Sequence, residues 1–228
     1  MQILVKQIKI LAVILFLFNV LFAQIGKLNV GFDIDDTVLY SEPMFLVAPT
    51  TTDGKIDYSW VNMHDKNFSL VIEPVETLIN FFRAHGHDVY FITARPSVNG
   101  KYVAEFLTEK LKFDIEVNKN LFFSPKETVA GFRYTSKHRL MTDLDIDIFY
   151  GDSDTDIIAA IKAGVHAVRI VRSDSSIAEY GSNYFGNTLK ATGPEAPFTR
   201  QELDTFYDTG VGVFGETIYP IVWNPPAQ

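Results

Sequence analysis

Two aspartates with one residue between them, Asp33 and Asp35, stand at the end of an apolar run that begins near Val30. If that run is a β-strand, both carboxylates point the same way, because residues two apart on a strand share a face. Two anions this close need a cation, a shared proton or a reaction that uses both. Among divalent metals, hard oxygen ligands of this kind favour magnesium. The alternative is a solvated loop that carries the pair by chance.

A second apolar run, residues 88–93, ends in Thr93 and is followed by Arg95. The run predicts a buried strand. A strand end that offers a hydroxyl, backbone amides and a cation suits an anionic group. The ordinary alternative for Thr93 is a β-branched residue that merely ends a strand.

A third run, residues 147–150, predicts another strand and leads into Gly151, Asp152 and Asp156. The glycine allows a tight turn after the strand, and Asp152 would add a carboxylate to a metal site. The serine and aspartate directly after Asp152 are also natural caps for the helix predicted next.

Lys137 lies on a helix predicted for about residues 135–142, 14 positions before Gly151. A lysine on a helix is usually solvated. It is therefore assigned to the site only because of its spacing from Gly151 and the other candidate residues around it in the sequence. The 5 histidines share no spacing, and the sequence contains no histidine-nucleophile motif, Ser/His/Asp order or glycine-rich phosphate loop. Those classes of phosphoryl or acyl transfer are therefore not indicated.

The segments between these residues alternate between helix and strand patterns. Helices are predicted at residues 73–86, 102–111 and 157–164, and further strands at residues 121–123 and 165–171. This alternation predicts a Rossmann-like α/β fold, a parallel sheet with helices on both faces. The polar groups above then fall at the carboxyl ends of strands, where open α/β folds place their sites.

The segment Phe32-Asp-Ile-Asp-Asp-Thr-Val-Leu39 resembles motif I of the haloacid dehalogenase superfamily, and more closely that of the bacterial class B acid phosphatases. The segment Tyr150-Gly-Asp-Ser-Asp-x-Asp-Ile157 resembles the second signature of the same class. The likeness extends over most of residues 30–172. One departure is Ala94, which stands where a glycine is common.

The resemblance implies an aspartyl-phosphate mechanism, in which Asp33 is the nucleophile and Asp35, kept partly protonated by its neighbours, is the acid and base. The residues expected to bind the phosphoryl group are Thr93, Arg95 and Lys137. One Mg²⁺ per subunit is expected on the side chains of Asp33 and Asp152 and the backbone carbonyl of Asp35. Asp156 would orient a metal-bound water or the lysine.

The function that the resemblance implies is that of an exported, magnesium-dependent acid phosphatase. Such an enzyme hydrolyses small phosphate monoesters, nucleotides among them, transfers phosphate to alcohols and forms a homotetramer. One alternative is another phosphoryl-transfer enzyme on this scaffold, such as a phosphomutase or phosphonatase, although these usually need a larger cap. The other is a binding or storage protein without activity, although such proteins usually lose the nucleophile.

The chain is predicted to divide into a signal peptide, residues 1–23, and a single phosphatase domain, residues 24–228. Lys6 and Lys9 precede a short apolar run that ends at the small residue Ala23, which is typical of a secretory signal. The alternative is an uncleaved membrane anchor, for which the run is short. Cleavage would leave a periplasmic or secreted protein without membrane contact.

Residues of about 40–72 predict an irregular insert that covers the cleft as a small cap. Its aromatic side chains either stack on a substrate ring or pack the insert onto the core; they are Phe45, Tyr58, Trp60 and Phe68. Residues of about 173–228 are predicted to be irregular, with an edge strand or arm at 212–223. Arg169 and Arg172 could reach a phosphate, but surface positions are expected for them.

Composition fits one acidic globular domain. The 228 residues carry 20 Lys and Arg against 28 Asp and Glu, a formal net charge of −8, whereas a binder of nucleic-acid polymers would show a basic excess. A hydrophobic content of 47% allows a sizeable core. Because there is no cysteine, disulfides, thiolate metal sites and a cysteine nucleophile are excluded.

Overall fold

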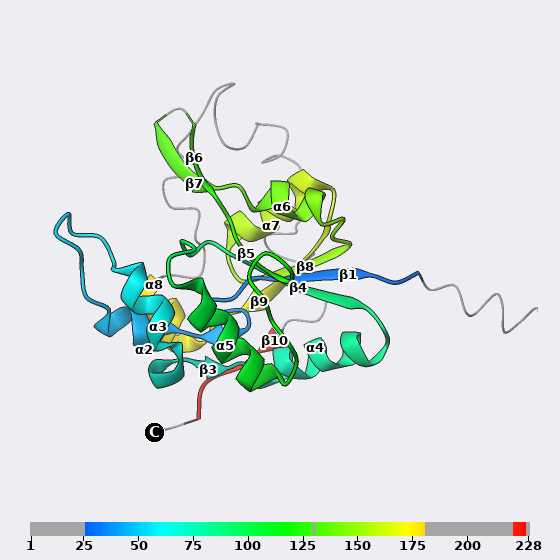
Figure 1. Ribbon diagram of the computed structural model, residues 1–228, viewed down its shortest axis with the longest axis horizontal. Helices are drawn as coiled ribbons and strands as arrows, with labels where there is room; N and C mark the ends of the chain where they lie inside the picture. Colours follow the sequence, from blue (N-terminus) through cyan, green and yellow to red (C-terminus); the bar gives the residue numbers. More distant parts are fainter. Residues whose placement is uncertain (1–25, 130, 181–220, 227–228) are drawn as a thin grey trace, which may run out of the picture.

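The computed structural model describes residues 26–129, 131–180 and 221–226, and in these ranges the chain forms a parallel sheet between two layers of helices (Figure 1). The strands, in spatial order, are β10 (Ile221–Val222), β9 (His166–Val171), β8 (Ile148–Gly151), β1 (Asn29–Phe32), β4 (Asp88–Thr93) and β5 (Leu121–Phe123). Every pairing among them is parallel. The predicted α/β class is confirmed. The predicted signal peptide, residues 1–23, lies outside the described residues.

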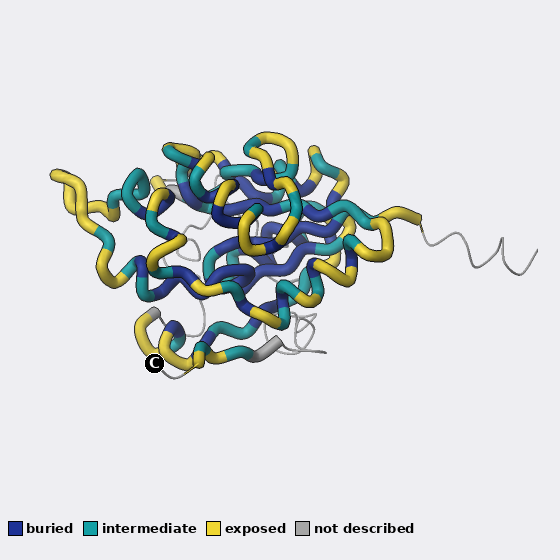
Figure 2. Tube along the Cα trace, turned by 60° about the horizontal axis from the view of Figure 1, so that its bottom comes forward, coloured by how far each residue is buried: buried dark blue, intermediate teal, exposed yellow. Residues whose placement is uncertain are grey.

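Helices cover both faces of the sheet and bury its strands. On one face lie α4 (Glu73–Ala84) and α5 (Gly100–Leu111), and on the other lie α6 (Lys137–Asp143) and α7 (Asp154–Ala163). Each face has its own apolar cluster, the larger under α4 and α5 and the smaller under α6 and α7. Figure 2 shows that the buried residues gather in the centre of the molecule and the exposed ones at its periphery.

The order in which the strands join decides where a site forms. The chain begins in the centre with β1, adds β4 and β5 on one side, and then returns to add β8 and β9 on the other. In open α/β sheets, ligands bind beyond the carboxyl ends of the strands at such a reversal. The strands β8, β1 and β4 are direct neighbours, so the residues that follow them meet at one edge.

The insert after β1 is more regular than predicted. It contains β2 (Leu39–Tyr40), α2 (Glu42–Val47), α3 (Tyr58–Phe68) and β3 (Leu70–Val71). The helix α3 begins where the Asp57 side chain accepts hydrogen bonds from the backbone N–H groups of Ser59 and Trp60, and it packs along α5. The expectation of an irregular excursion is therefore wrong, because a capped amphipathic helix and a short antiparallel ladder organise it.

Three further elements complete the described chain. A hairpin of β6 (Lys126–Val129) and β7 (Phe132–Thr135), which the sequence reading did not anticipate, precedes α6, so that helix begins at Lys137 and not near residue 135. The helix α8 (Asp174–Tyr180) follows β9, so the expectation of an irregular region from about residue 173 is wrong for these residues. The strand β10 occupies the sheet edge, one of the two alternatives for residues 212–223, and residues 212–220 lie outside the described residues. No helix in the described ranges has the length and apolar character to cross a membrane.

Candidate active site

Asp33 stands directly at the end of the central strand. β1 ends at Phe32, and the backbone N–H of Asp33 still donates to the carbonyl of Tyr150 on β8, at 2.8 Å. The chain then curls tightly, because the N–H groups of Thr37, Val38 and Leu39 all donate to the carbonyl of Ile34. Asp35 therefore lies in this curl and not on a strand, so the shared strand face that the spacing suggested is not what places it.

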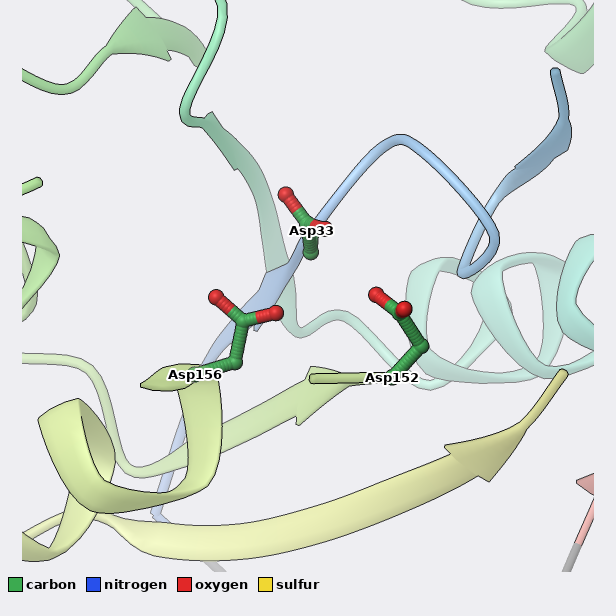
Figure 3. Close-up of side chains that lie close together, drawn as sticks. All are labelled: Asp33, Asp152 and Asp156. Atoms are coloured by element: carbon green, nitrogen blue, oxygen red, sulfur yellow. The ribbon is translucent and has the colours of Figure 1, made fainter. Parts of the chain in front are cut away.

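Three carboxylates converge at this edge (Figure 3). Asp33 follows β1, Asp152 follows β8, and Asp156 lies in the first turn of α7; each is buried, and one oxygen of each lies within 4.8 Å of the others. Gly151 makes this close approach possible, because a Cβ there would lie 2.5 Å from the Cβ of Asp156. Asp156 is further held by a reciprocal capping box with Ser153, the N-cap of α7.

Lys137, the first residue of α6, lies between two of these carboxylates. Its ammonium group donates to Asp33 Oδ1 at 2.5 Å and to Asp156 Oδ1 at 2.7 Å, and its side chain is 3% exposed. Burial alone would lower the pKa of Lys137, but the charges of Asp156 and Asp33 outweigh burial and raise this pKa. The lysine is therefore a buried, charged group of the site and not a solvated one.

The cluster carries more negative charge than its cations balance. Burial raises the pKa of Asp33 well above its usual range, Lys137 offsets only part of this effect, and Asp156 and Asp152 add repulsion. Burial likewise raises the pKa of Asp152, against the opposing charge of Arg172. A divalent cation bound here would remove this excess and favour the ionised carboxylates. The chemistry of these oxygens thus fits a hard metal ion.

Asp35 faces a different cation. Arg95 donates from Nε to Asp35 Oδ2 at 2.9 Å and from Nη2 to Oδ1 at 2.6 Å, and Ser41 Oγ donates to Oδ1 at 2.6 Å. Burial opposes ionisation of Asp35, but the charge and hydrogen bonds of Arg95, with the hydrogen bond of Ser41, lower its pKa. The structure therefore differs from the expectation of a partly protonated Asp35, because the arginine pairs with it directly.

Thr93 and Arg95 lie where the sequence reading put them, at the end of β4. Thr93 is fully buried, and its Oγ1 accepts a hydrogen bond from the backbone N–H of Arg95 at 3.1 Å. The guanidinium of Arg95 is 1% exposed and is directed at protein groups, Asp35, Asp65 and Asn62. In this arrangement the arginine has partners other than a phosphoryl group.

Arg169 and Arg172 are not at the surface, contrary to expectation. Arg169 is buried in an ion pair with Asp154 and donates to the carbonyl of Asp152 at 2.6 Å. Arg172 Nε lies 2.5 Å from Asp152 Oδ2. Both arginines support the β8–α7 turn. The expectation failed because Arg169 in β9 and Arg172 directly after it lie alongside acidic groups that follow the neighbouring strand β8.

A cavity of about 320 Å³ opens beside Asp35. Its lining includes Phe45 and Tyr58 of the insert, whose rings meet edge to face at 6.2 Å, and Arg172. The other two aromatic residues of the insert, Trp60 and Phe68, pack on each other at 5.7 Å. Phe45 and Tyr58 therefore line the cavity beside Asp35, whereas Trp60 and Phe68 contact each other within the insert.

Comparisons with known proteins agree with this arrangement. A model of the family described as HAD superfamily, subfamily IIIB (acid phosphatase) matches residues 1–177, well over half of the chain. The chain belongs to this family. HAD denotes the haloacid dehalogenase superfamily, whose motif I and class B signature are the segments that carry the carboxylates above.

Relatives of this HAD subfamily IIIB chain carry the name class B acid phosphatase. One from Edwardsiella ictaluri is 36% identical over 163 residues, which are 64% of this chain and 63% of that protein. One from Rahnella sp. is 34% identical over 156 residues, 64% of each chain. The chain thus spans just under two thirds of the length of these curated relatives. A haloacid dehalogenase-like hydrolase from Streptococcus pneumoniae aligns with 80% of this chain and 98% of its own, at 12% identity and a TM-score of 0.36.

Three contributors to the site had no signal in the sequence reading. Asp65 and Ser41 belong to the insert, where a polar residue is common. Asp36 follows Asp35 in sequence, but its side chain accepts a hydrogen bond from the Ser176 hydroxyl of α8. Asp65 and Asp36 bind partners that are distant in the chain, and Ser41 binds Asp35, which lies in a turn without a periodic pattern. A motif search could not have found them, because neither spacing nor composition marks these positions.

Proposed function

We propose that this chain is an acid phosphatase that hydrolyses small phosphate monoesters through a phosphorylated aspartate. The observation that carries the proposal is the position of Asp33, buried at the end of β1 with an ammonium group at 2.5 Å and two more carboxylates around it. A nucleophilic carboxylate needs a nearby positive charge to keep it ionised and to neutralise a phosphoryl group. Membership of the family supports the same assignment.

In the first step, an Asp33 oxygen attacks phosphorus, and the bond from phosphorus to the ester oxygen breaks in line. The leaving oxygen takes a proton from Asp35. A doubly negative phosphate beside Asp35 raises its proton affinity, which offsets the effect of Arg95 in the free protein. In the second step, Asp35 accepts a proton from water as the water attacks phosphorus, and orthophosphate and Asp33 are released.

Other residues of this chain bind the transferring group. Lys137 Nζ is already beside Asp33, and we assign it and the Thr93 hydroxyl to the phosphoryl oxygens. A divalent cation, for which we propose Mg²⁺, would be held by Asp33, Asp152 and the backbone carbonyl of Asp35, and it supplies positive charge to the phosphoryl oxygens. Asp156 positions Lys137, to which it is bonded at 2.7 Å.

We propose nucleotides among the substrates, because the cavity beside Asp35 presents two aromatic rings that can contact a base. Residues 40–72 then act as a small cap over a single catalytic domain. We also propose export with removal of residues 1–23, and assembly as a homotetramer. Amino-terminal sequencing of the exported protein and light scattering on the purified one test these two statements.

Hydrolysis of p-nitrophenyl phosphate tests the function. The purified protein should turn over with Mg²⁺, stop in EDTA and recover when Mg²⁺ is restored. Asp33→Asn should be inactive with metal present, while Asp53→Asn, the same change at an exposed turn, should match wild type. Full activity of the Asp33 variant would overturn the nucleophile assignment. An inert wild type with metal would favour a binding protein on this scaffold.

A further inference from the structure

Arg95 is the bulkiest of the fully buried side chains in the described ranges, and two carboxylates from different parts of the chain share it. Asp35, in the curl after β1, takes hydrogen bonds from Nε and Nη2. Asp65, in the last turn of α3, takes hydrogen bonds from Nη1 to Oδ2 at 2.6 Å and from Nη2 to Oδ1 at 3.0 Å. The guanidinium is therefore clamped between the catalytic loop and the insert.

Asp65 is itself firmly held. It is 1% exposed, and Ser69 Oγ donates to its Oδ1 at 2.7 Å. Asn62, one turn earlier on α3, accepts from Arg95 Nη1 at 3.4 Å and donates to the carbonyls of Pro96 and Val98, at 2.9 and 2.6 Å. One face of α3 thus fixes both the guanidinium and the backbone that follows it.

The packing and capping of α3 alone do not explain a carboxylate at this place. An anion in the last turn of a helix opposes the helix dipole, and a buried ion pair is seldom better than well-packed apolar side chains of similar volume. An apolar residue at position 65 alone would leave part of the buried Arg95 guanidinium without an acceptor. What the carboxylate adds is a fixed orientation for Arg95, because a fork of N–H donors is held in plane by two carboxylates.

We propose that Asp65 is a positioning residue of the phosphatase: it orients Arg95, and Arg95 orients the carboxylate of Asp35 toward the leaving oxygen. This inference rests on the proposed function. Without Asp65, Nη1 keeps only the 3.4 Å contact with Asn62 and one Nη2 hydrogen loses its buried acceptor, so the guanidinium turns and carries Asp35 with it. The insert then supports the acid directly, in addition to covering the cleft.

The leaving group offers a readout that a merely structural role would not move. A p-nitrophenolate ion departs with little help, whereas an alkoxide needs a proton at the moment the bond to phosphorus breaks. A misplaced Asp35 therefore slows alkyl esters far more than aryl esters. The quantity kcat/KM includes the steps up to that bond cleavage, so its ratio between the two substrates isolates proton delivery.

The experiment compares kcat/KM for p-nitrophenyl phosphate and glycerol 2-phosphate in wild type and Asp65→Asn. We expect the variant to lose about 10²-fold on the glycerol ester, the size of a general-acid contribution, and less than about 5-fold on the aryl ester. Asp57→Asn is the matched control, because it removes the same charge from the same insert but contacts only Ser59 and Trp60. Its ratio should equal that of wild type.

A second variant keeps the test decisive if Asp65→Asn folds poorly. Arg95→Lys retains the charge but not the fork, and it should change the substrate ratio in the same direction. The double variant should change the ratio no more than Arg95→Lys alone, since both act through one guanidinium. Equal losses on both substrates in Asp65→Asn, or an unchanged ratio in Arg95→Lys, would overturn the proposal while leaving the phosphatase assignment intact. An inactive wild type would overturn both.

Discussion

The ammonium group of Lys137 lies 2.5 Å from Asp33 Oδ1, although 104 residues separate the two in the chain. The contact forms because α6, which packs against α7 and β4, begins at Lys137 beside the residue that follows β1. Both partners are almost fully buried. A cation is thus fixed beside the carboxylate that we assign as nucleophile before any substrate arrives.

Replacing this lysine by methionine, which has a similar shape and no charge, should lower kcat by about 10²- to 10³-fold, the cost of removing one preorganised donor to a phosphoryl group. The free energy of unfolding in EDTA should also fall by about 3–5 kcal/mol, because Asp33 and Asp156 lose their buried partner. Phosphatase assays and urea titrations measure the two effects. Lys101→Met, at an exposed position on α5, is the control. Wild-type kcat in Lys137→Met would remove Lys137 from the mechanism.

Gly151→Ala should reduce activity through Asp156. The new Cβ would lie 2.5 Å from Asp156 Cβ and 3.0 Å from its Cγ, so the carboxylate that holds Lys137 must move. A displacement of about 1 Å at a reacting group can cost about 10²-fold in rate. Gly31→Ala makes an equally close contact, 2.6 Å, but with the ring of Phe149 in the core.

We therefore expect Gly31→Ala to lower the melting temperature more than the rate, and Gly151→Ala to lower the rate more than the melting temperature. Gly26→Ala, where nothing lies within 4 Å, should change neither. If the two close-contact variants lose rate and stability in the same proportion, the effect of Gly151→Ala is not specific to Asp156.

The pH dependence of stability should carry the signature of Asp36. Burial, and then the charge of Asp152, raise the pKa of this carboxyl to about 7, whereas in the unfolded chain it is about 3.9. Between these values the folded protein holds a proton that the unfolded chain has lost, so stability falls as pH rises. The loss is complete above about pH 7.

Asp36→Asn removes this titration, and asparagine can keep the left-handed backbone of φ 55° at this position. In EDTA, the variant should match wild type near pH 4 and become progressively more stable than wild type up to pH 7. Thermal unfolding at several pH values measures this difference. A difference that is independent of pH, or that shrinks as pH rises, would contradict the raised pKa.

The fold was predictable because it follows from local pattern, whereas the candidate site residues were predicted from strand ends together with the resemblance to a known family. Buried strands show as apolar runs, and the polar groups that follow them meet wherever parallel strands are neighbours. The order of the strands places Asp152 near Asp33, and Lys137 also lies beside Asp33.

The supporting residues could not be predicted, because their roles depend on contacts between segments that are distant in the chain. Asp65 matters only because α3 packs against α5 and presents it to Arg95, and the sequence reading did not expect that helix. The direction of the Asp35 pKa depends on the same contact with Arg95. Arg172 was expected at the surface because neither its spacing nor its neighbours in sequence reveal its contact with Asp152, which follows the neighbouring strand β8.

The central claim is that Asp33 becomes phosphorylated, and rapid acid quenching tests it most directly. Wild type with Mg²⁺ is mixed for milliseconds with a nucleoside 5′-monophosphate labelled with ³²P, quenched in acid, digested and mapped. The account predicts label on the peptide that contains Asp33, and none in Asp33→Asn. Label on another residue, or turnover by Asp33→Asn at the wild-type rate, would contradict it.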